Sequence, residues 1–383
     1  QPYREYPAKA TGNDHFDAHP AISDWYETVK LNYGVDYVGG GERHFFPIPD
    51  TWEKMLNILL FWGTKGIDGF RCDMAEMVPV EFWEWCIPLV KSKYPNMLFI
   101  AEIYNPSEYH NYLLRGKFDY LYDKVGLYDT LRNITCGYET ADAITHCWQS
   151  LGGIEKNMVN FLENHDEQRI ASDFYAGDAR KAISALIVAA CMNTNPMMIY
   201  FGQELGEQGM DYEGFSGRDG RTSIFDYWCV DSIRRWRNED TFDGKELTDN
   251  VQRLRSLYQR ILLLCNEEQA ITQGSFYDLM YVNQYNWKFN RHKQYAFLRK
   301  YKNEILLVLA NFDELSVEVG INIPAHAFEF LDLPQLEVCT VVDLLTGKEE
   351  QITLLPDKTV HTSVGAWNGK ILKISADKAI NIQ

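Results

Sequence analysis

The chain has 383 residues, of which 46% are hydrophobic and 14% aromatic, and its formal net charge is −17. A chain of this length and composition can bury a large core and exceeds one typical domain, so two domains are expected. The acidic balance argues against nucleic acid as a partner, because a phosphate-binding surface needs clustered Lys and Arg. No apolar run reaches the length of about 18 residues that a bilayer requires, so no membrane span is predicted.

The signals for cellular location are few. The eight cysteines form no CxxC pair and no zinc-type spacing with histidine, so they are interpreted as small buried hydrophobic residues. No charged and then apolar leader stands at Gln1, so any signal peptide lies outside this chain. Localisation stays open, with a periplasmic or secreted location preferred to a cytoplasmic one.

Residues 1–60 are rich in Gly, His, Tyr and Pro and are predicted to be the remainder of a loop domain, with one helix near 52–62. From 61 to 270, short apolar runs alternate with longer helical patterns. Strands and helices in series predict parallel pairing with crossover helices. The expected strands are 66–73, 96–103, 118–123, 157–164 and 196–204, and the expected helices are 80–94, 138–152, 177–192 and 250–269.

The pattern changes after residue 270. From 271 to 383, β-rich segments are separated by Gly, Asn or Pro, and no helix is expected. This pattern predicts an antiparallel all-β domain, most simply a sandwich. The expected strands are 295–301, 304–313, 315–323, 337–345 and 370–375.

Acidic side chains recur at the carboxyl ends of three predicted strands. Asp73 ends the first strand, Glu102 ends the second, and Asp166 follows the fourth, directly after His165. In parallel α/β folds, function collects at this edge of the sheet. One acid there is usually a solvated loop residue or a helix cap. Three at equivalent positions, beside Arg71 and His165, predict one catalytic face.

Several carboxylates with one arginine and one histidine fit retaining glycoside hydrolysis. That reaction needs an ionised carboxylate as nucleophile and a protonated carboxyl as general acid, about 5 Å apart. Arg71 would hold Asp73 anionic, whereas Glu102 could stay protonated through burial and neighbouring acids. A metal site built from these acids and His165 is an alternative. Arg71 disfavours it, because the positive charge of its guanidinium would repel a metal cation bound beside it.

Four segments, in the right order along the chain, resemble the α-amylase family, glycoside hydrolase family 13. GFRCDMA, FIAEI and FLENHD are similar to that family's second, third and fourth signature segments, and PMMIYFGQELG is similar to its eighth barrel strand. The resemblance implies an α/β fold, a partial (β/α)8 TIM barrel with strands resembling four to eight, followed by the β-sandwich. It also implies retaining hydrolysis of α-glucosidic bonds in starch-like α-glucans or maltooligosaccharides.

The resemblance assigns roles residue by residue. Asp73 would be the nucleophile, Glu102 the general acid and base, and Asp166 the carboxylate that binds sugar hydroxyls and supports the transition state. Arg71 would orient Asp73, and His165 would contact the sugar in the cleaved subsite.

Two further positions follow from the same comparison. Tyr104, just after Glu102, is expected either to stack on a sugar ring or to pack within its loop. The family often has Lys-His three and four positions after the nucleophile, where the His carbonyl can serve a structural calcium and the Lys a leaving-group subsite. This chain has Glu76-Met77 there, which counts against the structural calcium and against the lysine of the leaving-group subsite. No cofactor is expected for the chemistry, and no metal ligand is assigned.

The first three barrel strands and the first signature segment are not found in the chain. The chain is therefore expected to be the carboxyl-terminal part of a longer amylase, with the missing N-terminal part of the barrel as a partner and little activity alone. An α-glucosidase or a glucosyl transferase on the same scaffold is the nearest alternative. A non-catalytic glucan-binding relative is another, which the three acids disfavour because a binder has no need for a nucleophile and an acid together.

Overall fold

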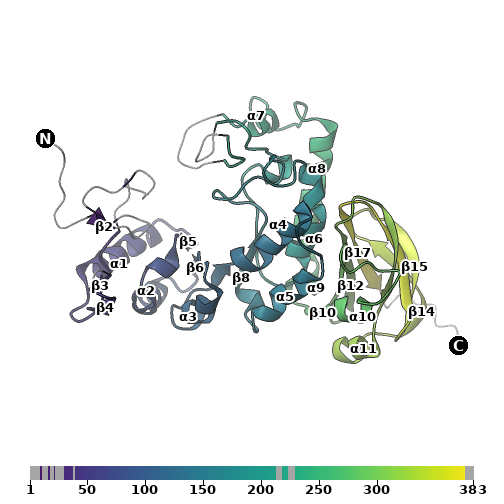
Figure 1. Cartoon of the computed structure of the whole chain (residues 1–383), viewed down its shortest axis with the longest axis horizontal. Coiled ribbons are helices and arrows are strands. Elements are labelled where there is room, and N and C mark those ends of the chain that lie inside the picture. Colours follow the sequence, from purple (N-terminus) through teal and green to yellow (C-terminus); the bar gives the residue numbers. More distant parts are fainter. Residues whose placement is uncertain are drawn as a thin grey trace. The chain divides into compact units, whose positions relative to one another are not determined.

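The computed structural model describes residues 9–10, 16–17, 21, 30–37, 39–212, 218–222 and 229–375. The chain divides into two compact units, Gln1–Leu121 and Tyr122–Gln383, and each is described by itself (Figure 1). Most of the predicted loop domain before residue 30 lies outside the described residues. The domain bounds 1–60, 61–270 and 271–383 stay predictions.

The first unit contains the beginning of the predicted strand and helix series. Strands β5, β6 and β7 pair in parallel, with Gly69 opposite Leu98 and Ile100 opposite Tyr120. The described elements are β1 (Lys9–Ala10), β2 (Phe16–Asp17), β3 (Val35–Asp36), β4 (Glu42–Arg43), α1 (Asp50–Gly63), β5 (Gly69–Cys72), α2 (Val80–Lys93), β6 (Leu98–Ala101), α3 (Tyr109–Leu114) and β7 (Tyr120–Tyr122). The expected helices near 52–62 and over 80–94 are present, whereas α3 was not expected.

Strands β5 and β6 approach closely at Gly69. A Cβ atom at this position would lie 2.6 Å from the carbonyl oxygen of Leu98, a distance that real Cβ atoms do not reach. The pairing continues past both strands, because the N–H of Glu102 donates to the Cys72 carbonyl at 3.1 Å and the N–H of Ala75 donates to the Glu102 carbonyl at 3.2 Å. The two carboxyl ends are therefore tied together by backbone hydrogen bonds.

Helix α2 buries one face built at helical spacing. Trp83, Cys86, Ile87 and Val90 follow the i, i+3, i+4, i+7 pattern and are all buried. This pattern gives one apolar stripe along a helix. The ring of Trp83 packs edge-on against Phe118 at 4.9 Å between centroids. The packing holds α2 beside the segment that leads into β7.

The second unit continues the series and adds the β domain. Strands β8 and β9 pair in parallel, with Asn160 opposite Met197. The described elements up to residue 272 are the π-helix Lys124–Tyr128, α4 (Asp129–Cys136), α5 (Ala143–Ser150), β8 (Met158–Phe161), α6 (Ile183–Cys191), β9 (Met197–Met198), α7 (Asp231–Arg237), α8 (Asp249–Glu267) and α9 (Gln269–Thr272). Helices α4 and α7 were not expected, and the strand expected over 196–204 is limited to two residues.

Helix α6 is buried along its whole length and packs against α8 on one side and against strands β12 (Glu304–Asn311) and β17 (Asn368–Ser375) on another (Figure 1). The Ser184 hydroxyl donates to the Asn311 carbonyl at 2.6 Å. The buried guanidinium of Arg299 donates to the carbonyls of Met192 at 2.7 Å and Ala270 at 3.0 Å. One core therefore runs through the helical part and the β domain of this unit.

The β domain is antiparallel. A six-stranded sheet has the order β10-β11-β12-β17-β14-β15, and β13 pairs with β16. Its elements are β10 (Ser275–Asp278), α10 (Met280–Asn283), β11 (Gln294–Tyr301), β12 (Glu304–Asn311), β13 (Val317–Asn322), α11 (Ala325–Leu331), β14 (Leu336–Asp343), β15 (Glu349–Leu354), β16 (Thr359–Val364) and β17 (Asn368–Ser375). The predicted fold class is confirmed as a partial (β/α) barrel followed by an antiparallel β-sheet domain.

The expectation of no helix after residue 270 is wrong, because α10 and α11 lie there and α9 extends to Thr272. Helix α11 begins after Pro324 and buries Ala327, Phe328 and Leu331 on one side. Its two turns are too short to show a helical period in a β-rich region. Strands β10, β15 and β16 were missed because they are short or rich in polar residues. Among the described residues, no helix has the length and apolar character needed to cross a membrane.

Candidate active site

Arg71, Asp73 and Glu102 meet at the carboxyl ends of β5 and β6. Nη1 of Arg71 forms an ion pair with Oδ1 of Asp73, and Nη2 of the same guanidinium lies 2.9 Å from Oε1 of Glu102. The Asp73 side chain is 73% exposed and that of Glu102 only 2% exposed. The sequence assigned Arg71 to Asp73 alone, and the structure adds Glu102. One arginine therefore joins an accessible carboxylate to a buried one.

Both carboxyl oxygens of Glu102 have hydrogen-bond donors. The Tyr104 hydroxyl donates to Oε1 at 2.8 Å, and the backbone N–H of Met74 donates to Oε2 at 2.9 Å. Donors on both oxygens, together with the Arg71 guanidinium, restrict rotation of the carboxyl group. Such a fixed orientation is what acid and base catalysis requires of the group that transfers the proton.

Met74 has an unusual backbone conformation. Its φ of 44° and ψ of 42° place it in the left-handed region, which costs a residue other than glycine about 1–3 kcal/mol. The turn directs the Met74 N–H toward Glu102. Backbone strain of this kind collects at functional sites, where the surroundings hold it in place. Here the strained residue, which immediately follows Asp73, supplies an N–H donor to the buried carboxyl of Glu102.

Glu76 lies in the short 3-10 turn Ala75–Met77 and binds the loop that follows β6. Its Oε1 accepts the backbone N–H of Tyr104 at 3.1 Å, and its Oε2 accepts that of Asn105 at 3.1 Å. The Tyr112 hydroxyl donates to the carbonyl of Glu76 at 3.0 Å. In place of the Lys-His pair of the family, this chain thus has a carboxylate that caps two backbone donors.

His165 and Asp166 lie in the second unit, after strand β8. Nε2 of His165 is 3.3 Å from Oδ2 of Asp166. The buried side chain of Asn164 accepts the backbone N–H groups of Asp166 and Glu167, each at 2.9 Å. An asparagine side chain that accepts from the residues two and three positions on stabilises a local turn. Asn164 therefore orients the segment that carries His165 and Asp166.

A buried ion pair anchors the same segment. Nη1 of Arg169 donates to Oε2 of Glu163 at 2.7 Å, and Oε1 of Glu163 accepts the N–H of Ile170 at 2.7 Å. Arg169 also donates to the hydroxyl of Thr222 at 2.9 Å and to the carbonyl of Phe201 at 2.6 Å. Burial raises the pKa of Glu163, while Arg169 acts in the opposite direction. The pair therefore links the segment after β8 to the parts of the chain around Phe201 and Thr222.

Asp123 is another acid at a strand end, and no role for it was predicted from the sequence. It follows β7, is 2% exposed, and accepts the N–H of Leu127 at 2.8 Å, so it caps the π-helix. Burial raises the pKa of Asp123 from its ordinary 3.8 to about 6. An acid at a strand end can therefore have a structural role, as the cap of the helix that follows it.

The six residues predicted from the sequence fall into two groups. Arg71, Asp73, Glu102 and Tyr104 contact one another in the first unit, and His165 contacts Asp166 in the second. Their assigned roles stay predictions. Besides Asp123, three residues that contact or orient these groups were not predicted from the sequence: Met74, Glu76 and Asn164. The departure from Lys-His marked Glu76, and Asn164 stands beside His165, but no local signal indicates a left-handed methionine.

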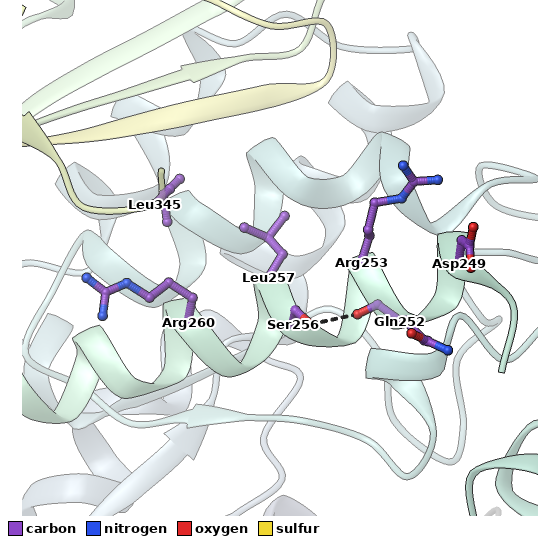
Figure 2. Close-up of a pocket in the computed structure, with 7 residues that line it drawn as sticks. All are labelled: Asp249, Gln252, Arg253, Ser256, Leu257, Arg260 and Leu345. Carbon is purple, nitrogen blue, oxygen red and sulfur yellow. Dashed lines mark hydrogen bonds between the residues drawn. The ribbon is translucent and has the colours of Figure 1, made fainter. Parts of the chain in front are cut away.

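A hollow of about 540 Å³ lies elsewhere, along α8 (Figure 2). Figure 2 shows Asp249, Gln252, Arg253, Ser256, Leu257, Arg260 and Leu345 around it. Arg260 is engaged there, because its Nε donates to the carbonyl of Leu344 at 2.7 Å. Asp249 is the one carboxylate among these lining residues. Glycoside hydrolysis needs two carboxyl groups, so this hollow does not have the composition of the catalytic site.

The fold defines the class of protein as a (β/α)-barrel type, with two carboxyl groups joined by Arg71 at the carboxyl ends of β5 and β6. The family model described as "Alpha amylase, catalytic domain" matches residues 47–260, which is more than half of the chain. The chain belongs to the α-amylase family, whose members act on α-glucans as hydrolases or transglycosylases.

Curated relatives support the family at low identity. Neopullulanase 2 of Thermoactinomyces vulgaris is 23% identical over 335 residues, which cover 84% of this chain and 49% of that protein. Alpha-amylase 3 of Dictyoglomus thermophilum is 24% identical, over 71% of this chain and 56% of that protein. An α-1,4-glucan:maltose-1-phosphate maltosyltransferase of Cereibacter sphaeroides is 35% identical, over only 22% of this chain and 16% of that protein. The chain spans about half the length of the first two.

Solved structures support the fold. A cyclomaltodextrinase superposes with a TM-score of 0.63 at 20% identity, covering 88% of this chain and 51% of that one. The α-amylase of Geobacillus thermoleovorans, complexed with acarbose, superposes with a TM-score of 0.62 at 16% identity, covering 87% and 66%. The likeness establishes the architecture that the sequence predicted.

Proposed function

We propose that the complete protein to which this chain belongs is a retaining glycoside hydrolase that cleaves α-glucosidic bonds in starch-like α-glucans or maltooligosaccharides. The contact of one guanidinium, that of Arg71, with both Asp73 and Glu102 carries this proposal. Retaining hydrolysis needs two carboxyl groups that act on one bond. The names of the relatives, a neopullulanase and an α-amylase, support the choice of an α-glucan as substrate.

In the first step, the Asp73 carboxylate attacks the anomeric carbon and forms a glycosyl ester. The bond to the leaving sugar breaks as Glu102 gives a proton to the glycosidic oxygen. In the second step, Glu102 takes a proton from a water molecule that attacks the anomeric carbon, and Asp73 is released. The exposure of the Asp73 side chain suits a nucleophile that must reach a polymer.

The contacts of Glu102 indicate which neighbour can accommodate the proton of its acid form. Oε2 accepts the N–H of Met74, which cannot reverse its direction. Oε1 accepts the Tyr104 hydroxyl, and a hydroxyl can either donate or accept. Oε1 also lies 2.9 Å from Nη2 of Arg71, which can only donate. Of these three contacts, the Tyr104 hydroxyl is therefore the one that can turn to accept the proton of the acid form.

Asp166 and His165 are assigned to the sugar in the cleaved subsite. The Asn164 side chain holds their backbone, and the contact of 3.3 Å between His165 and Asp166 keeps the two side chains together. A carboxylate and an imidazole in this arrangement can accept and donate hydrogen bonds to neighbouring sugar hydroxyls.

No cofactor is proposed for the chemistry, and the residues after Asp73 do not fit a structural calcium. The carbonyl of Met77 accepts the hydroxyl of Tyr37 at 3.4 Å, and those of Glu76 and Val78 accept the hydroxyl of Tyr112 at 3.0 and 2.9 Å. These backbone oxygens face tyrosine donors rather than a cation. No step of the proposed mechanism passes through a metal.

Glycosyl transfer is the second candidate. It uses the same ester on Asp73, with a sugar hydroxyl in place of water in the second step. The match of a short part of the chain to a maltosyltransferase supports glycosyl transfer as this second candidate. A non-catalytic binder is disfavoured because Asp73 and Glu102 are both present and joined by Arg71.

The test uses the complete protein with maltoheptaose. We expect new reducing ends of retained configuration, followed by chromatography and proton NMR, and a fall in kcat of roughly 10³-fold or more in Asp73→Asn, because the nucleophile is lost. Glu84→Gln is the control, since Glu84 pairs with Arg115 on the surface of the same unit. Normal turnover by Asp73→Asn would refute the assignment, and products longer than maltoheptaose would favour the transferase.

A further inference from the structure

We propose that Glu76 is a positioning residue for the general acid Glu102. The inference rests on the proposed function, because it concerns the step in which Glu102 protonates the leaving sugar. Glu76 does not touch Glu102. It acts through the loop after β6, which carries Tyr104, and the structure provides each contact in that path.

The first contact is a clamp on the backbone of the loop. The two carboxylate oxygens of Glu76 accept the N–H groups of two consecutive residues, Tyr104 and Asn105, each at 3.1 Å. Hydrogen bonds to an ionised acceptor are stronger than those between neutral groups, and two together also fix direction. Residues 102–105 have no regular secondary structure, so no ladder supplies partners for these donors. Glu76 takes the place that a neighbouring strand would have.

The turn that carries Glu76 is itself held by hydrogen bonds from two helices. The hydroxyl of buried Tyr112 donates to the carbonyl of Glu76 at 3.0 Å and to that of Val78 at 2.9 Å, and Nε1 of Trp83 donates to the carbonyl of Ala75 at 3.1 Å. The turn that carries Glu76 is thus fixed to α2 and α3. Because the turn is fixed, the Glu76 carboxylate restrains the position of the loop and does not move with it.

The last contact reaches the acid. The hydroxyl of Tyr104 lies 2.8 Å from Oε1 of Glu102, and it can turn to accept the proton of the acid form. Release of the loop by loss of Glu76 lets Tyr104 shift, and a hydrogen bond weakens steeply as its distance and angle change. Displacements of about 1 Å in a catalytic group can reduce the rate by about 10²-fold. Glu76 therefore affects proton donation without touching the substrate.

The experiment separates proton donation from general damage through the leaving group. In the complete protein, kcat/KM is measured for maltoheptaose, whose leaving sugar needs a proton, and for 2,4-dinitrophenyl α-maltoside, whose leaving group needs none. For Glu76→Gln we expect a loss of roughly 10-fold on maltoheptaose and less than about 2-fold on the aryl maltoside. In the Tyr104→Phe background the same substitution is expected to cost less than about 2-fold, because the path is already cut.

Equal losses on the two substrates, no loss on either, or full additivity with Tyr104→Phe would overturn the role of Glu76. Glu84→Gln, which removes a surface carboxylate of the same unit, is the matched control and should leave both substrates unaffected. If Glu76→Gln does not fold, Glu76→Asp decides the same question, since it keeps the charge but is too short to reach both N–H groups. Glu102→Gln tests the proposed function separately: normal hydrolysis of maltoheptaose by that variant would remove Glu102 as the acid, whatever Glu76 does.

Discussion

Asp123 allows a quantitative test of how burial changes an acid at a strand end. Its pKa is raised by burial from 3.8 to about 6, against the opposing N–H groups of Leu127 and Gly126. Between these two pH values the folded state keeps a proton that the unfolded state releases. The stabilising contribution of the neutral carboxyl is therefore complete below about pH 4 and is lost as the pH rises through 6. A difference of about 2 pKa units corresponds to about 3 kcal/mol.

The substitution Asp123→Asn removes the titration and keeps an oxygen that can accept the N–H of Leu127. The free energy of unfolding of this variant, relative to the wild type, is expected to rise by about 3 kcal/mol between pH 4 and pH 7.5. Denaturant unfolding followed by tryptophan fluorescence at four pH values measures it. Asn133→Ala is the control, because this exposed residue has no titratable group.

A difference that stays constant over this range would refute the reasoning, because it would mean that the folded and unfolded states bind the same number of protons at Asp123. A difference that falls with pH would show that the backbone N–H groups of the π-helix stabilise the carboxylate more than burial destabilises it. In the first case the cap and burial would balance, and in the second the cap would outweigh burial.

Two further predictions concern stability. Arg169→Met should destabilise the second unit by about 3–5 kcal/mol in chemical denaturation, because the carboxylate of Glu163 would stay buried without its partner, and adding Glu163→Gln should recover part of the loss. A cost below about 1 kcal/mol would contradict the idea that this pair anchors the segment after β8. Gly126→Ala should lower stability by about 1–3 kcal/mol in thermal unfolding, since its Cβ would lie 2.5 Å from Oδ1 of Asp123. An unchanged midpoint would show that Asp123 moves freely.

The candidate site illustrates how far sequence reasoning extends. Asp73 and Glu102 could be placed together because each directly follows a strand, and the carboxyl ends of parallel strands share one edge. Their contact with Arg71 agrees with that placement. The hydroxyl of Tyr104 was not expected to reach Glu102, because its direction depends on the path of an irregular loop. Sugar stacking by Tyr104 stays a prediction.

The fold was predictable to a similar extent. The long helices and the parallel strands have clear periodicity or continuous apolar runs, and these appear at the expected places. Helix α11 was missed because two turns beside β-rich segments do not establish a period. The complete burial of α6 was not apparent either, since an apolar run fits a buried strand or a buried helix, and its neighbours come from elements far along the chain.

By itself, the sequence determined the family, the series of parallel strands with long helices between them, and the acids that end the strands, because these depend on residue types and their local spacing. The tertiary structure alone decided which donors reach the two oxygens of Glu102, and that Glu76 holds the loop of Tyr104 from 28 residues away. It also decided the left-handed conformation of Met74. These features depend on where the chain returns after a helix, and only packing sets that position.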